Sequence, residues 1–163
     1  MVNAKTRVLL QVVISFIYYG VVTGTNCKDG WMAYHNSCYL FARSHASTFT
    51  EAEHYCRQHG GNLVTIETKA ENLFIRDYLR GLKDEHHWLG LTDEMVEGIW
   101  KWYSTNTDAT YTDWNPGEPN SAGGEEDCAI LAYNQDYRWL DVSCISSWEP
   151  ICEIESGEVD IVG

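Results

Sequence analysis

Side chains that could bind a metal ion gather in and just after a long polar segment of the chain. The segment runs from residue 104 to 127, is rich in Asn, Asp, Gly and Glu, and holds two of the three prolines. Glu118, Asn120 and Glu126 lie within it, and Asp141 follows. Their carboxylate and amide oxygens are hard ligands, of which a calcium ion takes about six to eight. Since a loop this long inside a compact domain is usually functional or disordered, these residues predict a calcium site.

The composition limits the partners that such a site could serve. The chain has 163 residues and a formal net charge of −13 at neutral pH. A surface this acidic repels nucleic acids and anionic lipids and attracts cations. We therefore expect no nucleic-acid partner, although solubility outside the cell would explain the charge equally well.

The N-terminus carries a pattern typical of secreted proteins. Two cations precede an apolar run over residues 8–22, which ends in small residues. A membrane anchor is the alternative, but the run is short and is interrupted by Gln11 and Ser15. We predict that residues 1–24 are a signal peptide cleaved near Gly24, and that the protein is extracellular without membrane insertion.

All six cysteines lie beyond this predicted signal, in a compartment where disulfides persist. A structural zinc site is the alternative, but no two cysteines have the CxxC spacing, so we predict three disulfides. The sequence alone does not choose among the possible pairings. The cysteines are Cys27, Cys38, Cys56, Cys128, Cys144 and Cys152.

Local patterns predict a first helix in the N-terminal half. Thr50, with Glu53 three residues later, has the spacing of a capping box, in which a side chain at each end satisfies a free backbone group. Ala52 and Cys56 follow at helical spacing, and the glycines at 60–61 provide the stop.

A second helix is predicted to begin at Thr68, which has Glu71 three residues later, and to end at Gly81. Short strands follow without an alternating βαβ rhythm, so the predicted fold class is α+β with mainly antiparallel pairing. One domain is expected over residues 25–155, followed by an acidic tail over 156–163. The predicted strands cover residues 34–41, 62–66, 88–91, 99–103, 128–133 and 148–153.

Several motifs together resemble the C-type lectin family over residues 27–153. The resemblance implies the C-type lectin fold, with two helices and a long calcium-binding loop. It also implies the disulfides Cys27–Cys38, Cys56–Cys152 and Cys128–Cys144. The motifs are Cys27-Lys28-Asp29-Gly30-Trp31, residues 52–56, Gly60-Gly61-Asn62-Leu63, Trp88-Leu89-Gly90-Leu91, Glu118-Pro119-Asn120, Glu126-Asp127-Cys128 and Trp139-x-Asp141-x-x-Cys144.

The resemblance further implies what Glu118, Asn120, Glu126 and Asp141 do. In the family they hold one calcium ion beside a cis Pro119, and two adjacent sugar hydroxyls complete the coordination. The carboxylates then accept hydrogen bonds from these hydroxyls and the amide donates one. The order Glu118-Pro119-Asn120 resembles the mannose-type arrangement, which takes mannose, fucose, glucose or N-acetylglucosamine. We expect a carbohydrate-binding protein of extracellular, for example innate immune, recognition.

Two positions depart from the family pattern. Leu140 stands where sugar-binding members have an Asn, so the ion loses one ligand and we expect weaker binding. A second calcium site in the family matches Asp93, Glu97 and Asp127, but Ser121 replaces its remaining acid or amide. These three acids could instead be solvated surface charge.

Two other classes of function remain to be weighed. A calcium-independent interaction protein on the same fold, binding a protein, mineral or ice surface, is favoured by Leu140 and Ser121. An enzyme is not expected, because the sequence holds no nucleophile motif and no base positioned by a neighbour. Any homo-oligomer would form through the domain surface, since no heptad or collagen-like segment is present.

Aromatic residues and histidines are assigned mainly to packing. His86 and His87 would point to opposite faces of a strand and so could not share an ion easily. Tyr133, Tyr137 and Arg138 are expected to flank the candidate site. The tryptophans are expected mostly in the core: Trp31, Trp88, Trp100, Trp102, Trp114, Trp139 and Trp148.

Overall fold

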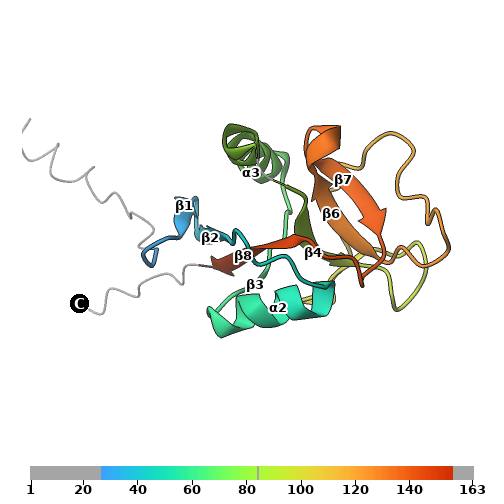
Figure 1. The fold of residues 1–163 in the computed structure, drawn as a ribbon, viewed down its shortest axis with the longest axis horizontal. Coiled ribbons are helices and arrows are strands. Elements are labelled where there is room, and N and C mark those ends of the chain that lie inside the picture. The colour runs from blue at the N-terminus through green and yellow to red at the C-terminus, as the bar shows by residue number, and fades with distance from the viewer. Residues whose placement is uncertain (1–26, 84, 156–163) are drawn as a thin grey trace, which may run out of the picture.

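The computed structural model describes residues 27–83 and 85–155 (Figure 1). The predicted signal peptide and the predicted acidic tail lie outside these residues. No helix in the described part of the chain has the length and apolar character needed to span a bilayer. The elements are β1 (Met32–Tyr34), β2 (Ser37–Phe41), α2 (Phe49–Gln58), β3 (Asn62–Leu63), α3 (Lys69–Leu82), β4 (His87–Thr92), β5 (Lys101–Trp102), β6 (Cys128–Ala132), the 3₁₀ helix η1 (Tyr133–Gln135), β7 (Arg138–Val142) and β8 (Glu149–Glu155).

The strands form a sheet of order β1-β2-β8-β4-β6-β7, with β3 added to β8 and β5 to β4. Every pair is antiparallel except β4 with β8, so the α+β prediction with mainly antiparallel pairing is confirmed. In Figure 1, α2 and α3 lie on opposite sides of β8, and the long connection from β5 to β6 lies beside β7. The fold therefore holds that connection at the end of the molecule away from the β1–β2 hairpin.

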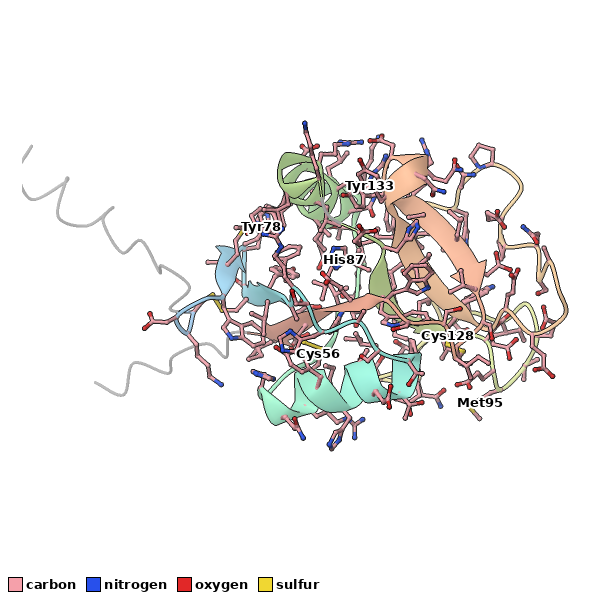
Figure 2. All side chains as sticks on the ribbon, in the orientation of Figure 1. Cys56, Tyr78, His87, Met95, Cys128 and Tyr133 are labelled. Atoms are coloured by element: carbon pink, nitrogen blue, oxygen red, sulfur yellow. A yellow bond between two sulfur atoms is a disulfide. The ribbon has the colours of Figure 1, made fainter. Side chains whose placement is uncertain are left out.

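Two clusters of apolar side chains make the core, one beneath each helix. Ile75 and Leu79 of α3 join the first cluster, with Trp102 and Trp139. Phe49 and Cys56 of α2 join the second, with Trp88. Figure 2 shows Cys56 on the side of α2 that faces β8 and His87 in the centre of the molecule. The prediction that the tryptophans are mostly core is confirmed: Trp88, Trp100, Trp102 and Trp139 are buried, and Trp31, Trp114 and Trp148 are partly buried.

The predicted start of the first helix is wrong by two residues. Thr48, not Thr50, is the N-cap, and the carboxylate of Glu51 accepts from the Thr48 backbone N–H at 3.0 Å. Both threonines precede an acid at the same spacing, but only the earlier start brings Phe49, 1% exposed, into the buried face of α2. Glu53 is instead a buried acceptor for the backbone N–H of Leu63, at 2.8 Å.

The second helix begins as predicted and ends later. The hydroxyl of Thr68 accepts from the backbone N–H of Glu71 at 3.2 Å. The helix continues past Gly81 to a left-handed cap at Lys83, whose backbone N–H donates to the Leu79 carbonyl.

Several strands differ from the predicted ranges. The predicted strand over 34–41 is a hairpin that turns at residues 35–36, and the strand predicted over 62–66 is only two residues long. β7 was not predicted as a strand, although its burial alternates, with Trp139 and Asp141 on the covered face. Strand β7 forms because Arg138–Val142 pairs with β6, and no local sequence signal indicates that pairing.

The three disulfides predicted from the resemblance are confirmed. Cys27–Cys38 closes the N-terminal hairpin, Cys56–Cys152 joins α2 to β8, and Cys128–Cys144 joins the start of β6 to the turn after β7. No cysteine is left free for zinc.

Candidate functional site

Strand β7 presents Asp141 to the long connection between β5 and β6. Asp141 pairs in register with Ala129 of β6 and is only 4% exposed. Its Oδ2 accepts hydrogen bonds from the backbone N–H groups of Asn120 at 2.8 Å and Ser121 at 2.6 Å. The connection is therefore fastened to β7 at the residues predicted to bind the ion.

Glu118 and Asn120 also contact one another. The side-chain amide of Asn120 donates to a carboxylate oxygen of Glu118. The Glu118–Pro119 peptide bond is cis, as the resemblance predicted. Three of the four predicted ligands thus form one contiguous group.

The charge of Glu126 interacts with the carboxylates of this group. Burial, followed by the nearby Asp141 carboxylate and the charge of Glu126, raises the pKa of Glu118. Burial and then the charge of Asp141 raise the pKa of Glu126. A cation between these carboxylates would offset the charge repulsion that raises the pKa of Glu118 and of Glu126.

One oxygen of the site has no partner. Oδ1 of Asp141 is buried without a hydrogen bond among the described residues. A buried carboxylate oxygen without a partner is costly, because it loses its hydration and gains nothing in return. The donor chemistry, three carboxylates and an amide oxygen, suits a hard divalent cation. The residues present therefore fit calcium.

The second predicted group lies beside the first. Asp93 is 3% exposed, its Oδ2 accepts from the Gly98 N–H at 2.8 Å, and its Oδ1 is also buried without a described partner. Its backbone N–H donates to the Asp127 carbonyl at 3.1 Å. Burial, then the charges of Glu97 and Asp127, raise the pKa of Asp93.

The two departures from the family pattern have distinct surroundings. The hydroxyl of Ser121 donates to Glu97 at 2.7 Å, and its backbone N–H binds Asp141, so it links the two acidic groups. Leu140 packs against the core cluster beneath α2, on the face of β7 opposite Asp141.

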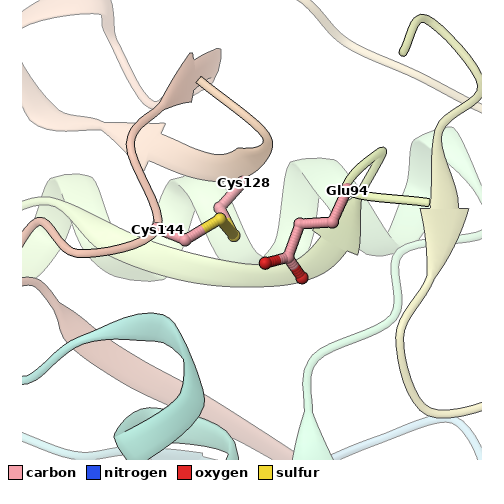
Figure 3. Close-up of side chains that lie close together, drawn as sticks. All are labelled: Glu94, Cys128 and Cys144. Atoms are coloured by element: carbon pink, nitrogen blue, oxygen red, sulfur yellow. A yellow bond between two sulfur atoms is a disulfide. The ribbon is translucent and has the colours of Figure 1, made fainter. Parts of the chain in front are cut away.

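The predicted carboxylate ligands do not form a group of three or more whose ligand atoms all lie within 4.8 Å of one another. Within the described residues, the group of His, Cys, Asp or Glu atoms lying within 4.8 Å of one another is Glu94 with Cys128 and Cys144. Figure 3 shows the Glu94 carboxylate beside these two cysteines, which are bonded to each other and so offer no thiolate ligand. This group is not a metal site.

A cleft of about 910 Å³ lies elsewhere, between the β1–β2 hairpin, the start of α3 and β8. None of the predicted ligands lines it. Tyr39 donates from its hydroxyl to Glu71 at 2.8 Å, and Glu153 accepts from the Thr65 N–H at 3.0 Å. Burial raises the pKa of Glu153 to about 7. No sequence pattern indicated that these two partly buried acids, Glu71 and Glu153, lie together.

The residues expected to flank the site do not all do so. Tyr137 is 2% exposed and its hydroxyl donates to the Leu79 carbonyl at 3.1 Å, so it belongs to the core beneath α3. Arg138 pairs with Asp113 at 2.9 Å. Tyr133 is the first residue of η1 and is exposed (Figure 2). Tyr137 precedes β7, and its burial follows from its contact with α3, which no local pattern indicates.

The two histidines have separate surroundings, as expected. His86 Nδ1 accepts from the Tyr133 N–H at 3.1 Å, and its ring packs edge-on against Trp148. His87 is fully buried in β4. They do not form a common metal site.

The chain matches a known protein family. The family model described as the lectin C-type domain matches residues 45–154, more than half of the chain. The chain belongs to the C-type lectin family. Members of this family bind carbohydrate without catalysis, so this C-type lectin domain is not an enzyme.

Individual C-type lectins resemble the chain over most of its length. Lactose-binding lectin l-2 of Anguilla japonica is 33% identical over 97% of this chain and 100% of that protein. The carbohydrate-recognition domain of the mouse scavenger receptor C-type lectin has a TM-score of 0.72 and 32% identity, covering 80% of this chain and 98% of that domain. A calcium-independent type II antifreeze protein has a TM-score of 0.71 and 28% identity, covering 80% and 95%.

Proposed function

We propose that this C-type lectin is a secreted, calcium-dependent protein that binds mannose-type sugars in extracellular, for example innate immune, recognition. The observation that carries the proposal is the buried Oδ1 of Asp141, which has no described partner and lies in a group with Glu118 and Asn120. Such an oxygen is expected where a cation belongs.

Glu118, Asn120, Glu126 and Asp141 would hold the ion. When bound, calcium supplies coordination positions for two adjacent sugar hydroxyls. The carboxylates of Glu118 and Glu126 accept hydrogen bonds from these hydroxyls, and the Asn120 amide donates to a hydroxyl lone pair. Charge-assisted bonds of this kind are roughly twice as strong as neutral ones, which compensates for a shallow site.

Asp93, Glu97 and Asp127 support a second cation position that braces the connection rather than touching sugar. The buried unpaired Oδ1 of Asp93 is the reason to include them. Ser121 joins this group to the first through Glu97 and Asp141, so occupation of either position stabilises the other.

The sugar class is the part of the proposal that the relatives challenge. The Anguilla japonica relative is named for lactose, a galactoside. The order Glu118-Pro119-Asn120 supports mannose, fucose, glucose or N-acetylglucosamine instead, through vicinal equatorial hydroxyls. A direct comparison of the two classes is therefore part of the test.

A calcium-independent interaction protein is the second candidate. Leu140 faces the core and offers no ligand, and one structural neighbour is a calcium-independent antifreeze protein. On this alternative the acidic residues would act only as a solvated surface that contacts a protein, mineral or ice.

A glycan array measured with calcium, with chelator, and with calcium restored separates the candidates. The proposal expects mannose-, fucose- or N-acetylglucosamine-type signal that chelator abolishes and calcium restores. Signal on galactosides alone would contradict the sugar class. Binding that is unchanged in chelator would contradict calcium dependence and support the second candidate.

A further inference from the structure

The connection between β5 and β6 contains no named helix or strand, so its shape depends on side-chain contacts and on scattered backbone hydrogen bonds, including an isolated bridge between Trp114 and Trp139. The most extensive contacts meet at Asp113, about midway along it. Oδ2 of Asp113 accepts from the Asn72 amide at 2.8 Å and from Arg76. Oδ1 accepts from Arg138 at 2.9 Å. Helix α3 and strand β7 therefore both hold this carboxylate.

The two partners on α3 are largely removed from water. Asn72 is 1% exposed, and the side chain of Arg76 is 7% exposed. The oxygen of the Asn72 amide accepts from the Trp139 indole N–H at 3.0 Å. A buried ion pair stabilises a fold less than its charge suggests, but it fixes geometry when each partner is also hydrogen-bonded.

A series of backbone hydrogen bonds leads from Asp113 to the candidate ligands. The Trp139 N–H donates to the Asp113 carbonyl at 3.1 Å, and the Asn115 N–H donates to the Trp139 carbonyl at 2.9 Å. The Glu118 N–H then donates to the Asn115 carbonyl at 2.9 Å. Trp139 and Asp141 lie on the same face of β7, so the strand that holds Asp113 also carries a ligand.

We propose that Asp113 is a positioning residue: Asn72 and Arg76 of α3 hold its carboxylate, and it thereby sets residues 115–121 against β7 and determines the cation affinity of the site. The affinity part of this inference depends on the proposed function. The effect on the connection itself does not, because it concerns the protein without a cation.

Asp136 provides a matched control. It also pairs with Arg76, at 2.9 Å, and with Arg80, but it lies in the turn between η1 and β7 and does not contact the connection. It has a left-handed backbone, which Asn tolerates well. Asp136→Asn removes the same charge from the same arginine without releasing residues 115–121.

The first measurement is hydrogen exchange of the calcium-free protein. The N–H groups of Asn115, Glu118, Asn120 and Ser121 all donate hydrogen bonds, so their exchange reports the connection directly. In Asp113→Asn we expect exchange there to accelerate about tenfold, and in Asp136→Asn less than about twofold. Equal acceleration in both variants, or none in Asp113→Asn, would overturn the inference.

The second measurement is calorimetric titration with calcium alone. Residues that orient metal ligands are worth about 10–100-fold in affinity, so we expect Asp113→Asn to weaken binding about tenfold and Asp136→Asn less than about twofold. Because the ligands remain, saturating calcium should restore full sugar binding in Asp113→Asn. Wild-type affinity in Asp113→Asn would contradict positioning, whereas a wild-type protein that binds no calcium would contradict the proposed function.

Should Asp113→Asn fail to fold, Arg138→Gln carries the same test. Its side chain is 42% exposed, so its loss leaves Asp113 paired with Arg76 and the core intact. We expect a weakening of calcium binding of about threefold, below the 10–100-fold range because one contact of the carboxylate is lost rather than all. No change in both exchange and affinity would overturn the inference.

Discussion

Two regions of this C-type lectin domain hold pairs of carboxylates that are partly or fully buried, and they differ in how the carboxylate oxygens are satisfied. In the cleft beside β8, Glu71 and Glu153 accept hydrogen bonds from a tyrosine hydroxyl and from backbone N–H groups. Beside β7, Asp93 and Asp141 each retain a buried oxygen without a described partner. The first region is complete with the protein's own groups, whereas the second is the one that we propose a cation completes.

The largest expected effect comes from neutralising the second region. In Asp141→Asn we expect calcium affinity to fall at least about a hundredfold, because loss of a charged ligand exceeds the 10–100-fold cost of losing an orienting partner. Calorimetric titration measures it. Glu153→Gln is the matched control in the first region and should bind calcium as the wild type does. Equal effects of the two substitutions would abolish the distinction between the regions.

The next effect concerns the first region and its pH dependence. Burial raises the pKa of Glu153 from 4.5 to about 7, so the folded state binds its proton more tightly than the unfolded state. This contribution to the free energy of unfolding is present below pH ~4.5 and is lost as pH rises to ~7. Glutamine does not titrate, so we expect this loss to be absent in Glu153→Gln. Between pH 5 and pH 8 the free energy of unfolding of the wild type should therefore fall by on the order of 1–3 kcal/mol more than that of the variant.

Chemical denaturation in chelator at the two pH values checks this expectation. Glu155→Gln is the control, because Glu155 lies on the same strand but is exposed. A wild-type protein and a Glu153→Gln variant with parallel pH profiles would show that burial of Glu153 has no energetic consequence.

The smallest expected effect is a gain of calcium and sugar affinity in the second region. Leu140→Asn restores an amide where the family pattern has one, and we expect calcium and sugar binding to tighten about threefold to tenfold, the value of one hydrogen-bonding group. Since Leu140 packs against the cluster beneath α2, the free energy of unfolding in chelator should fall by about 1 kcal/mol. Titration and denaturation measure the two changes, and an unaltered calcium titration would count against the position of the site.

Much of the fold could be predicted because its signals are local or belong to a strong ordered set of motifs. The start of α3 depends on Thr68 and Glu71 alone, and the disulfide pairing followed from the family resemblance. The start of α2 could not be chosen, because Thr48 and Thr50 carry the same spacing and only the burial of Phe49 distinguishes them. The structure brings Glu118, Asn120 and Asp141 into contact, while their role as calcium ligands stays a prediction.

The residue types and their spacing already supply the components: acids and an amide on a long polar connection, six cysteines able to pair, and aromatic residues sufficient for a core. Which of these components contact one another depends on how the chain packs. Arg76 and Asp113 are 37 residues apart, and Trp139 and Asn72 are 67 apart. Ser121 contacts Glu97, which is 24 residues away in the chain. Strand β7 forms by pairing with β6. Local patterns reflect the conformational preferences of a few neighbouring residues, whereas contacts at these separations depend on how the sheet and helices pack together.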